Sequence, residues 1–137
     1  MSLGLPYDSD GGRAHAAALT ALMHGEALRA SAALAARLGP CAAYADNRAD
    51  FARVVRQHEE AVDAIDRQLV PPALFAELRS TWSGLAEETK DRPAYRNAQV
   101  TLLAPTGTIC FMMVCDTTGI EPELSLVRHK PLVRRGT

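Results

Sequence analysis

A short glycine-containing segment, Pro105-Thr-Gly-Thr-Ile109, carries the residue types best suited to chemistry in this chain. A bound phosphate needs several converging hydrogen-bond donors, and a glycine turn that opens a helix supplies unpaired backbone N–H groups at the positive end of the helix dipole. Gly107 lets the backbone approach an anion closely, and Thr106 and Thr108 each add a hydroxyl donor. The segment predicts an anion-binding turn, although Thr-Gly-Thr also occurs in ordinary turns.

The three cysteines, Cys41, Cys110 and Cys115, are an odd number without a Cys-x-x-Cys pair. This pattern fits neither a disulfide framework nor a zinc site and favours a reducing compartment. For Cys110 and Cys115, which follow the turn, the pattern favours small buried hydrophobic side chains over reactive thiols.

Other polar and aromatic residues give weaker signals. His58 falls within the apolar face of a predicted helix and has no carboxylate or second histidine four residues away, so a satisfied boundary histidine is favoured over a metal ligand. Trp82, the single tryptophan, is favoured as a core or interface anchor over a base-stacking platform. Neither Glu121 nor His129 has a nucleophile at a recognisable spacing, and these two are favoured as turn-stabilising and surface residues.

One long helix is predicted, and its alanine-rich part covers residues 14–36. It should begin near Ser9, an N-cap residue followed by an acidic side chain, and end at Gly39-Pro40. Gly25 interrupts the helix and is tolerable where a neighbouring backbone approaches closely. The larger apolar residues recur at three- and four-residue steps and form a thin stripe, namely Leu19, Leu22, Met23, Ala27, Ala30, Leu34 and Leu38.

Two further amphipathic helices are predicted before the turn. The second should be capped by Asp46 or Asn47. Its apolar face consists of Phe51, Val54, Val55, His58, Val62, Ile65 and Leu69. The third should begin at Pro71-Pro72 and fade through the polar residues 87–92.

Beyond Pro93 the residue pattern changes from helical to strand-like. Residues 99–103 are apolar and partly β-branched, and proline bounds them, so they predict a buried strand. Residues 124–129 predict a second short strand. We therefore expect one mainly α (α+β) domain over residues 1–137, with a helical part at 8–92 and a strand, phosphate turn and strand at 93–137.

The length and composition of the chain limit the classes of protein to which it can belong. The chain has 137 residues, of which 47% are hydrophobic, enough for one domain with a core. A net charge of -1 argues against a partner that is a nucleic acid or a membrane surface. The basic residues at 128–135 are favoured as a solvated tail. No apolar run approaches the length of a bilayer span and the start lacks a signal-peptide pattern, so we expect a soluble, cytoplasmic protein.

Several segments carry a family resemblance. They are Gly4-Leu-Pro-Tyr-Asp-Ser-Asp, Ala21-Leu-Met-His-Gly-Glu-Ala, Leu38-Gly-Pro, Tyr95-Arg-Asn-Ala-Gln-Val-Thr-Leu-Leu-Ala-Pro-Thr-Gly-Thr-Ile, Phe111-Met-Met and Cys115-Asp-Thr-Thr-Gly-Ile-Glu-Pro. In order and spacing they resemble the adenosylcobalamin-dependent (class II) ribonucleotide reductases. The match is most specific over residues 95–122.

The resemblance implies a place in the later part of the catalytic barrel domain, where the family's matching turn holds the phosphate groups of the ribonucleotide substrate. Carried over residue by residue, Thr106, Gly107, Thr108 and Ile109 are the expected phosphate contacts. The family uses adenosylcobalamin, which we do not expect this chain to bind alone. Nothing in the sequence assigns a catalytic residue or a metal ligand.

The chain also departs from the family pattern. Family members reduce the 2′-hydroxyl with a thiyl radical, aided by an Asn-x-Cys-x-Glu loop and a redox cysteine pair, and no such loop occurs here. A chain of this length cannot form a ten-stranded barrel. It resembles a fragment or truncated relative that is inactive alone.

We expect a homo-oligomer, plausibly a dimer, or a complement from another reductase chain. One alternative is a non-catalytic helical oligomerisation or regulatory module. Another is a stand-alone enzyme with Glu121 or His129 as base.

Overall fold

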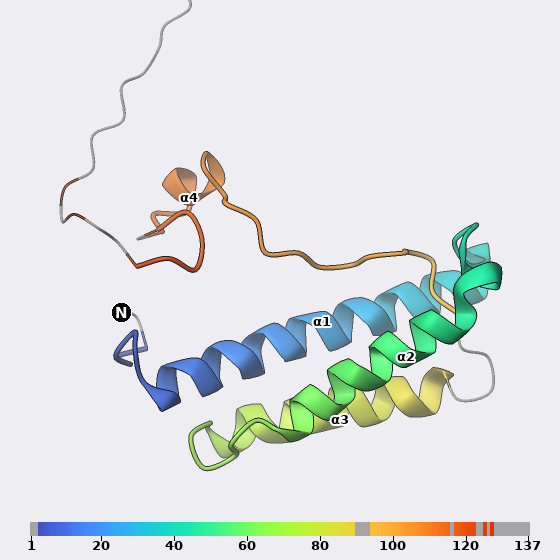
Figure 1. Ribbon diagram of the computed structural model, residues 1–137, viewed down its shortest axis with the longest axis horizontal. Helices are drawn as coiled ribbons and strands as arrows, with labels where there is room; N and C mark the ends of the chain where they lie inside the picture. Colours follow the sequence, from blue (N-terminus) through green and yellow to red (C-terminus); the bar gives the residue numbers. More distant parts are fainter. Residues whose placement is uncertain (1–2, 90–93, 116, 123–124, 126, 128–137) are drawn as a thin grey trace, which may run out of the picture. The chain divides into compact units, whose positions relative to one another are not determined.

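The computed structural model describes residues 3–89, 94–115, 117–122, 125 and 127. The chain divides into two compact units at Thr101 (Figure 1). The first unit contains α1 (Asp10–Leu38), α2 (Tyr44–Asp63) and α3 (Pro72–Thr89), and the second contains the short α4 (Ile109–Met112). The prediction of three helices before the turn is confirmed.

Both ends of α1 follow from local chemistry. The Oγ of Ser9 accepts a hydrogen bond of 3.0 Å from the backbone N–H of Gly12, which satisfies one of the unpaired donors of the first turn. At the other end Gly39 has φ 80°, and its N–H donates to the carbonyl of Ala35. Glycine adopts this conformation without the Cβ clash of other residues, so the predicted boundaries are confirmed.

The face of α1 that packs in the core differs from its predicted apolar stripe. Four large stripe residues are exposed, Leu19 by 47%, Met23 by 52%, Leu34 by 42% and Leu38 by 64%. The buried positions are mostly small and comprise Ala18, Gly25, Leu28, Ser31 and Ala35. Small side chains let neighbouring segments approach the helix closely, which is why they occupy the packed face.

α1 and α3 approach each other closely at Gly25. A Cβ at Gly25 would lie 2.8 Å from Cγ2 of Thr81 and 3.0 Å from Nε1 of Trp82. The neighbour is therefore a pair of side chains and not the predicted backbone. Trp82 is 2% exposed and donates its Nε1–H to the carbonyl of Ala21, which confirms its prediction as a core anchor.

The other two helices agree with the predicted pattern except at their ends. α3 begins at Pro72, as predicted. α2 begins before Asp46 and Asn47 and has no side-chain cap, so the predicted caps are wrong; Asn47 instead donates to the carbonyl of Ala43. α2 also ends at Asp63, which leaves Ile65 and Leu69 of the predicted face in the connection to α3. The shared core includes Leu28, Tyr44, Val62, Leu78, Trp82, Leu85 and Tyr95.

The predicted strands are not found among the described residues, which contain helices, turns and extended segments only. Residues 94–101 run antiparallel to α1 as an extended segment (Figure 1). The N–H of Cys41 donates to the carbonyl of Tyr95, and the N–H of Arg96 donates to the carbonyl of Ser31. A β-prone run becomes a strand only beside another strand, and here its neighbour is a helix. Most of the second predicted strand, like His129 and the basic tail, lies outside the described residues.

None of the described helices combines the length and the apolar character needed to span a bilayer.

Candidate functional site

The predicted anion turn is closed by a hydrogen-bonded pair of segments in the second unit. The carbonyl of Thr118 accepts two hydrogen bonds from Thr106, at 2.6 Å from its backbone N and at 2.9 Å from its Oγ1. The described segment at residues 117–122 thus returns to the start of the turn at Thr118. The sequence places these two motifs near each other along the chain, but spacing alone does not reveal this pairing.

The start of α4 leaves backbone donors available. The N–H of Cys110 donates to the carbonyl of Thr106 at 2.9 Å, which closes the first helical turn. In the described part of the chain, the N–H groups of Gly107, Thr108 and Ile109 have no hydrogen-bond acceptor. Residues 106–109 are all exposed. A helix start that presents several unpaired N–H groups to solvent can hold an anion.

A second layer of contacts supports the carbonyl of Thr118. The Oγ1 of Thr118 donates to Oε1 of Glu121 at 2.6 Å, and the Oγ1 of Thr117 donates to the carbonyl of Gly119 at 2.8 Å. A Cβ at Gly119 would lie 2.5 Å from Oε2 of Glu121. Glycine at this position leaves room for the carboxylate.

The two cysteines beside the turn differ in environment. Cys110 is 1% exposed and its Sγ lies 3.4 Å from the carbonyl of Gly107, which confirms the prediction of a small buried side chain. Cys115 is exposed, so the same prediction is wrong for that residue. Its backbone N–H donates to the carbonyl of Cys110. No group of three or more potential metal ligands occurs in the part of the chain that the structure describes.

A histidine pair in the first unit was not predicted. The Nε2 of His24 on α1 lies 3.0 Å from Nδ1 of His58 on α2, and the Nδ1 of His24 lies 2.6 Å from Oγ1 of Thr101. This bond confirms the prediction that His58 is a hydrogen-bonded histidine at the edge of the core. Burial lowers the pKa of His24, and the nearby His58 lowers it further. The partner of His58 comes from another helix, so no spacing along α2 could reveal it.

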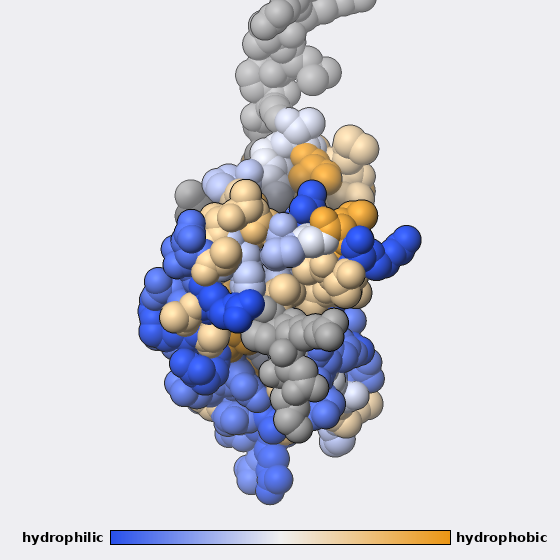
Figure 2. Space-filling model, turned by 90° about the vertical axis from the view of Figure 1, so that its right-hand side faces the viewer, coloured by the Kyte–Doolittle hydropathy of each residue, from blue (hydrophilic) through white to orange (hydrophobic). Residues whose placement is uncertain are grey.

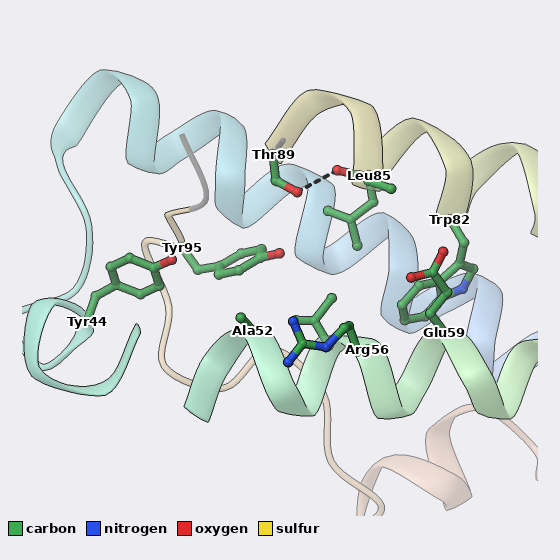
Figure 3. Close-up of a pocket in the computed structure, with 10 residues that line it drawn as sticks. Tyr44, Ala52, Arg56, Glu59, Trp82, Leu85, Thr89 and Tyr95 are labelled. Atoms are coloured by element: carbon green, nitrogen blue, oxygen red, sulfur yellow. Dashed lines mark hydrogen bonds between the residues drawn. The ribbon is translucent and has the colours of Figure 1, made fainter. Parts of the chain in front are cut away.

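A hollow of about 180 Å³ lies between α2 and α3 (Figure 3). Its walls are mainly aromatic and aliphatic, with Arg56 and Glu59 contributed by α2. Burial raises the pKa of both Tyr44 and Tyr95, so their phenols stay neutral at physiological pH. The Oγ1 of Thr89 donates to the carbonyl of Leu85 of its own helix. The hollow is an extension of the core, and its polar groups do not converge on a reactive centre.

A family model and individual relatives both relate this sequence to the ribonucleotide reductases. The sequence matches the family described as ribonucleotide reductase, barrel domain, over residues 1–137. It is 48% identical to the vitamin B12-dependent ribonucleotide reductase of Rhodopirellula baltica over 136 residues, which are 99% of this chain and 13% of that protein. The corresponding protein of Streptantibioticus cattleyicolor is 48% identical over 139 residues, which are 100% of this chain and 23% of the relative.

A third relative extends the same pattern. The vitamin B12-dependent ribonucleotide reductase of Agrobacterium fabrum is 43% identical over 151 residues, which cover 99% of this chain and 12% of the relative. The chain therefore spans less than a quarter of the length of each of these relatives. Over that span, it belongs to the ribonucleotide reductase barrel-domain family.

Proposed function

We propose that this chain is a segment of a vitamin B12-dependent ribonucleotide reductase and contributes the turn that binds the phosphate groups of the ribonucleotide. The observation that carries the proposal is the exposed turn at residues 106–109, whose backbone N–H groups at Gly107, Thr108 and Ile109 have no acceptor in the described part of the chain.

The chemistry of the turn suits a phosphate without a lysine or arginine beside it. Phosphate oxygens accept hydrogen bonds from backbone N–H groups, and several such bonds share the negative charge. The hydroxyl of Thr108 adds a further donor next to these N–H groups. Binding is the only role that these residues supply, because none of them is a nucleophile or a base at a recognisable spacing.

The hollow between α2 and α3 is smaller than the sites that hold drug-sized ligands. Drug-sized ligands occupy pockets of about 300–1,000 Å³, and the hollow between α2 and α3 measures about 180 Å³. A corrin ring with its nucleotide is larger than most drugs. We therefore assign no reaction step to cobalamin in this chain, and reduction of a ribonucleotide requires residues from the remaining parts of a reductase.

The exposed apolar residues of both units suit a chain that packs against such remaining parts. In the second unit Met112 is 77% exposed and Val114 is 89% exposed. In the first unit, the outer face of α1 carries the exposed residues Leu19, Met23 and Leu34 and supports a second candidate function, a non-catalytic helical oligomerisation module.

Calorimetric titration with ribonucleoside di- and triphosphates tests the proposal. We expect binding, and we expect Thr108→Val to weaken it about tenfold or more, because a hydrogen bond to a charged group contributes about 1.5–3 kcal/mol. Thr20→Val, which changes an exposed threonine on α1, is the matched control and should leave the affinity unchanged. Absence of heat with every nucleotide would contradict the proposal and favour the oligomerisation module.

A further inference from the structure

We infer that Glu121 is a positioning residue for the phosphate turn, and that Thr106 is a brace within that turn and not a direct contact of the phosphate. The inference rests on the proposed function, because it assigns different tasks to the residues of the same turn. It concerns contacts inside the second unit only.

A continuous series of hydrogen bonds links the carboxylate to the turn. Oε1 of Glu121 accepts from the hydroxyl of Thr118, at 2.6 Å. The carbonyl of Thr118 then accepts from both the N–H and the hydroxyl of Thr106. The carbonyl of Thr106 accepts in turn from the N–H of Cys110, which begins the hydrogen bonding of α4. The orientation of the peptide at Thr118 therefore sets the orientation of the turn.

Both hydrogen-bond donors of Thr106, its backbone N–H and its hydroxyl, are used in this series. A threonine hydroxyl has one hydrogen, and at Thr106 that hydrogen points to the carbonyl of Thr118. Phosphate oxygens need donors, and the lone pairs that remain on Thr106 Oγ1 cannot serve them. The donors left for a phosphate are the N–H groups of Gly107, Thr108 and Ile109 and the hydroxyl of Thr108. Thr106 holds the turn in place, while the three residues after it face the ligand.

Gly119 permits this arrangement. Because a Cβ there would lie 2.5 Å from Oε2 of Glu121, any larger residue would displace the carboxylate. The displaced atoms are at the far end of a flexible side chain, so Gly119→Ala should cost little stability and still break the bond between Thr118 and Glu121.

The negative charge of Glu121 and its hydrogen bond from Thr118 should affect phosphate binding in opposite directions. A carboxylate in the loop beside an anion site repels the anion, so removal of its charge alone would tighten phosphate binding. Loss of the hydrogen bond between Thr118 and Glu121 should instead loosen the turn and weaken phosphate binding. Glu121→Ala removes both the charge and the acceptor, whereas Glu121→Gln removes the charge and keeps an oxygen that accepts from Thr118.

The experiment uses the whole chain and two readouts. The first is the hydrogen-exchange rate of the Thr106 backbone amide, measured by nuclear magnetic resonance without ligand. The second is the affinity for a ribonucleoside diphosphate, measured by calorimetry. We expect Glu121→Ala, Thr118→Val and Gly119→Ala each to speed the exchange and to weaken binding about two- to tenfold, the effect of losing one hydrogen bond.

Conservative variants and a charge control complete the design. Glu121→Gln and Thr118→Ser keep the hydrogen bond and should retain slow exchange and wild-type or tighter binding. Glu77→Ala removes one exposed carboxylate from α3 and should leave the exchange at Thr106 unchanged. Circular dichroism of each variant should retain the helical signal of the first unit.

The two proposals fail in different ways. If the hydrogen-exchange rate of the Thr106 amide were unchanged in both Glu121→Ala and Thr118→Val, Glu121 would not position the turn. A higher nucleotide affinity of Glu121→Ala would also contradict this role. Absence of nucleotide binding by the wild-type chain would overturn the proposed function, while the exchange rates would still decide whether Glu121 positions the turn.

Discussion

Individual histidines join the helices of the first unit. The bond between Nε2 of His24 and Nδ1 of His58 needs one ring nitrogen to donate and the other to accept. The partners that face His24 are His58 from α2, Thr101 from the extended segment and the ring of Trp82 from α3. Burial of the His24 ring, and then the nearby His58, lower the pKa of His24 and so disfavour its protonation.

The free energy of unfolding should depend on pH through His24. Its pKa in the folded chain lies below the ordinary value of 6.5, chiefly because of burial, so the unfolded chain binds more protons in mild acid. The contribution of a neutral His24 to stability is complete above pH 6.5 and is lost as pH falls from 6.5 toward the lowered pKa. Urea unfolding followed by circular dichroism between about pH 5 and 8 measures this slope.

Two variants separate His24 from the other groups that titrate. His24→Asn keeps a polar group near Thr101 and removes the titration, so its stability should depend less on pH. His15→Asn, on the same helix and at a ring that bonds to the carbonyl of Gly11, is the matched control and should keep the wild-type slope. A wild-type slope in His24→Asn would show that the histidine pair is not responsible.

At the scale of the element, the extended segment at residues 94–101 takes the place of the predicted strand. Its residues bond to α1 through the backbone carbonyl of Ser31 and through the side chains of Ser31 and His24. The central contact is Ser31, which is 2% exposed. Its Oγ accepts from the N–H of Asn97 at 2.9 Å and donates to Oδ1 of the same residue at 3.1 Å.

Ser31→Ala should weaken the attachment of this segment to α1. The substitution removes two hydrogen bonds, and we expect it to lower the free energy of unfolding by about 1–2 kcal/mol. Backbone amides of residues 94–101 should exchange faster than those of α3. Ser83→Ala, on the exposed side of α3, is the control and should change stability by less than about 0.5 kcal/mol. Equal effects of the two substitutions would mean that Ser31 does not anchor the segment.

At the scale of the whole molecule, large apolar side chains remain exposed on both units. Leu102, Leu103 and Ile120 belong to the second unit, and the outer face of α1 belongs to the first. On the side that Figure 2 shows, hydrophilic residues predominate and apolar residues form patches among them. Exposed apolar patches of soluble proteins commonly mark interaction sites. The chain spans less than a quarter of the relatives it was compared with, and we propose that other reductase segments cover these apolar side chains.

In the absence of such segments, we expect the chain to self-associate through the outer face of α1. The double substitution Met23→Glu and Leu34→Glu should shift the species seen by sedimentation velocity toward the monomer, because it places charges on that face. Val54→Glu, at an exposed position of α2, should not. A wild-type chain that remains monomeric at high concentration would contradict the prediction.

The sequence predicted those helix ends that are set by residues at the ends themselves. Ser9, Gly39 and Pro72 act on their own helix ends, so α1 and the start of α3 follow from the sequence, and the motifs at residues 95–122 identified the family. The buried face of α1 did not follow, because apolar size favoured Leu19 and Met23 while close packing against Thr81 and Trp82 required Gly25.

Pairing between distant residues was decided only by the tertiary structure. Residues 99–103 have the composition of a strand, but their neighbour is a helix, and a strand needs another strand to complete its hydrogen bonds. The turn at residues 106–109 was predicted from its residue types. That Thr106 donates to Thr118 and Thr118 to Glu121 depends on how the chain folds back, which spacing along the sequence does not specify.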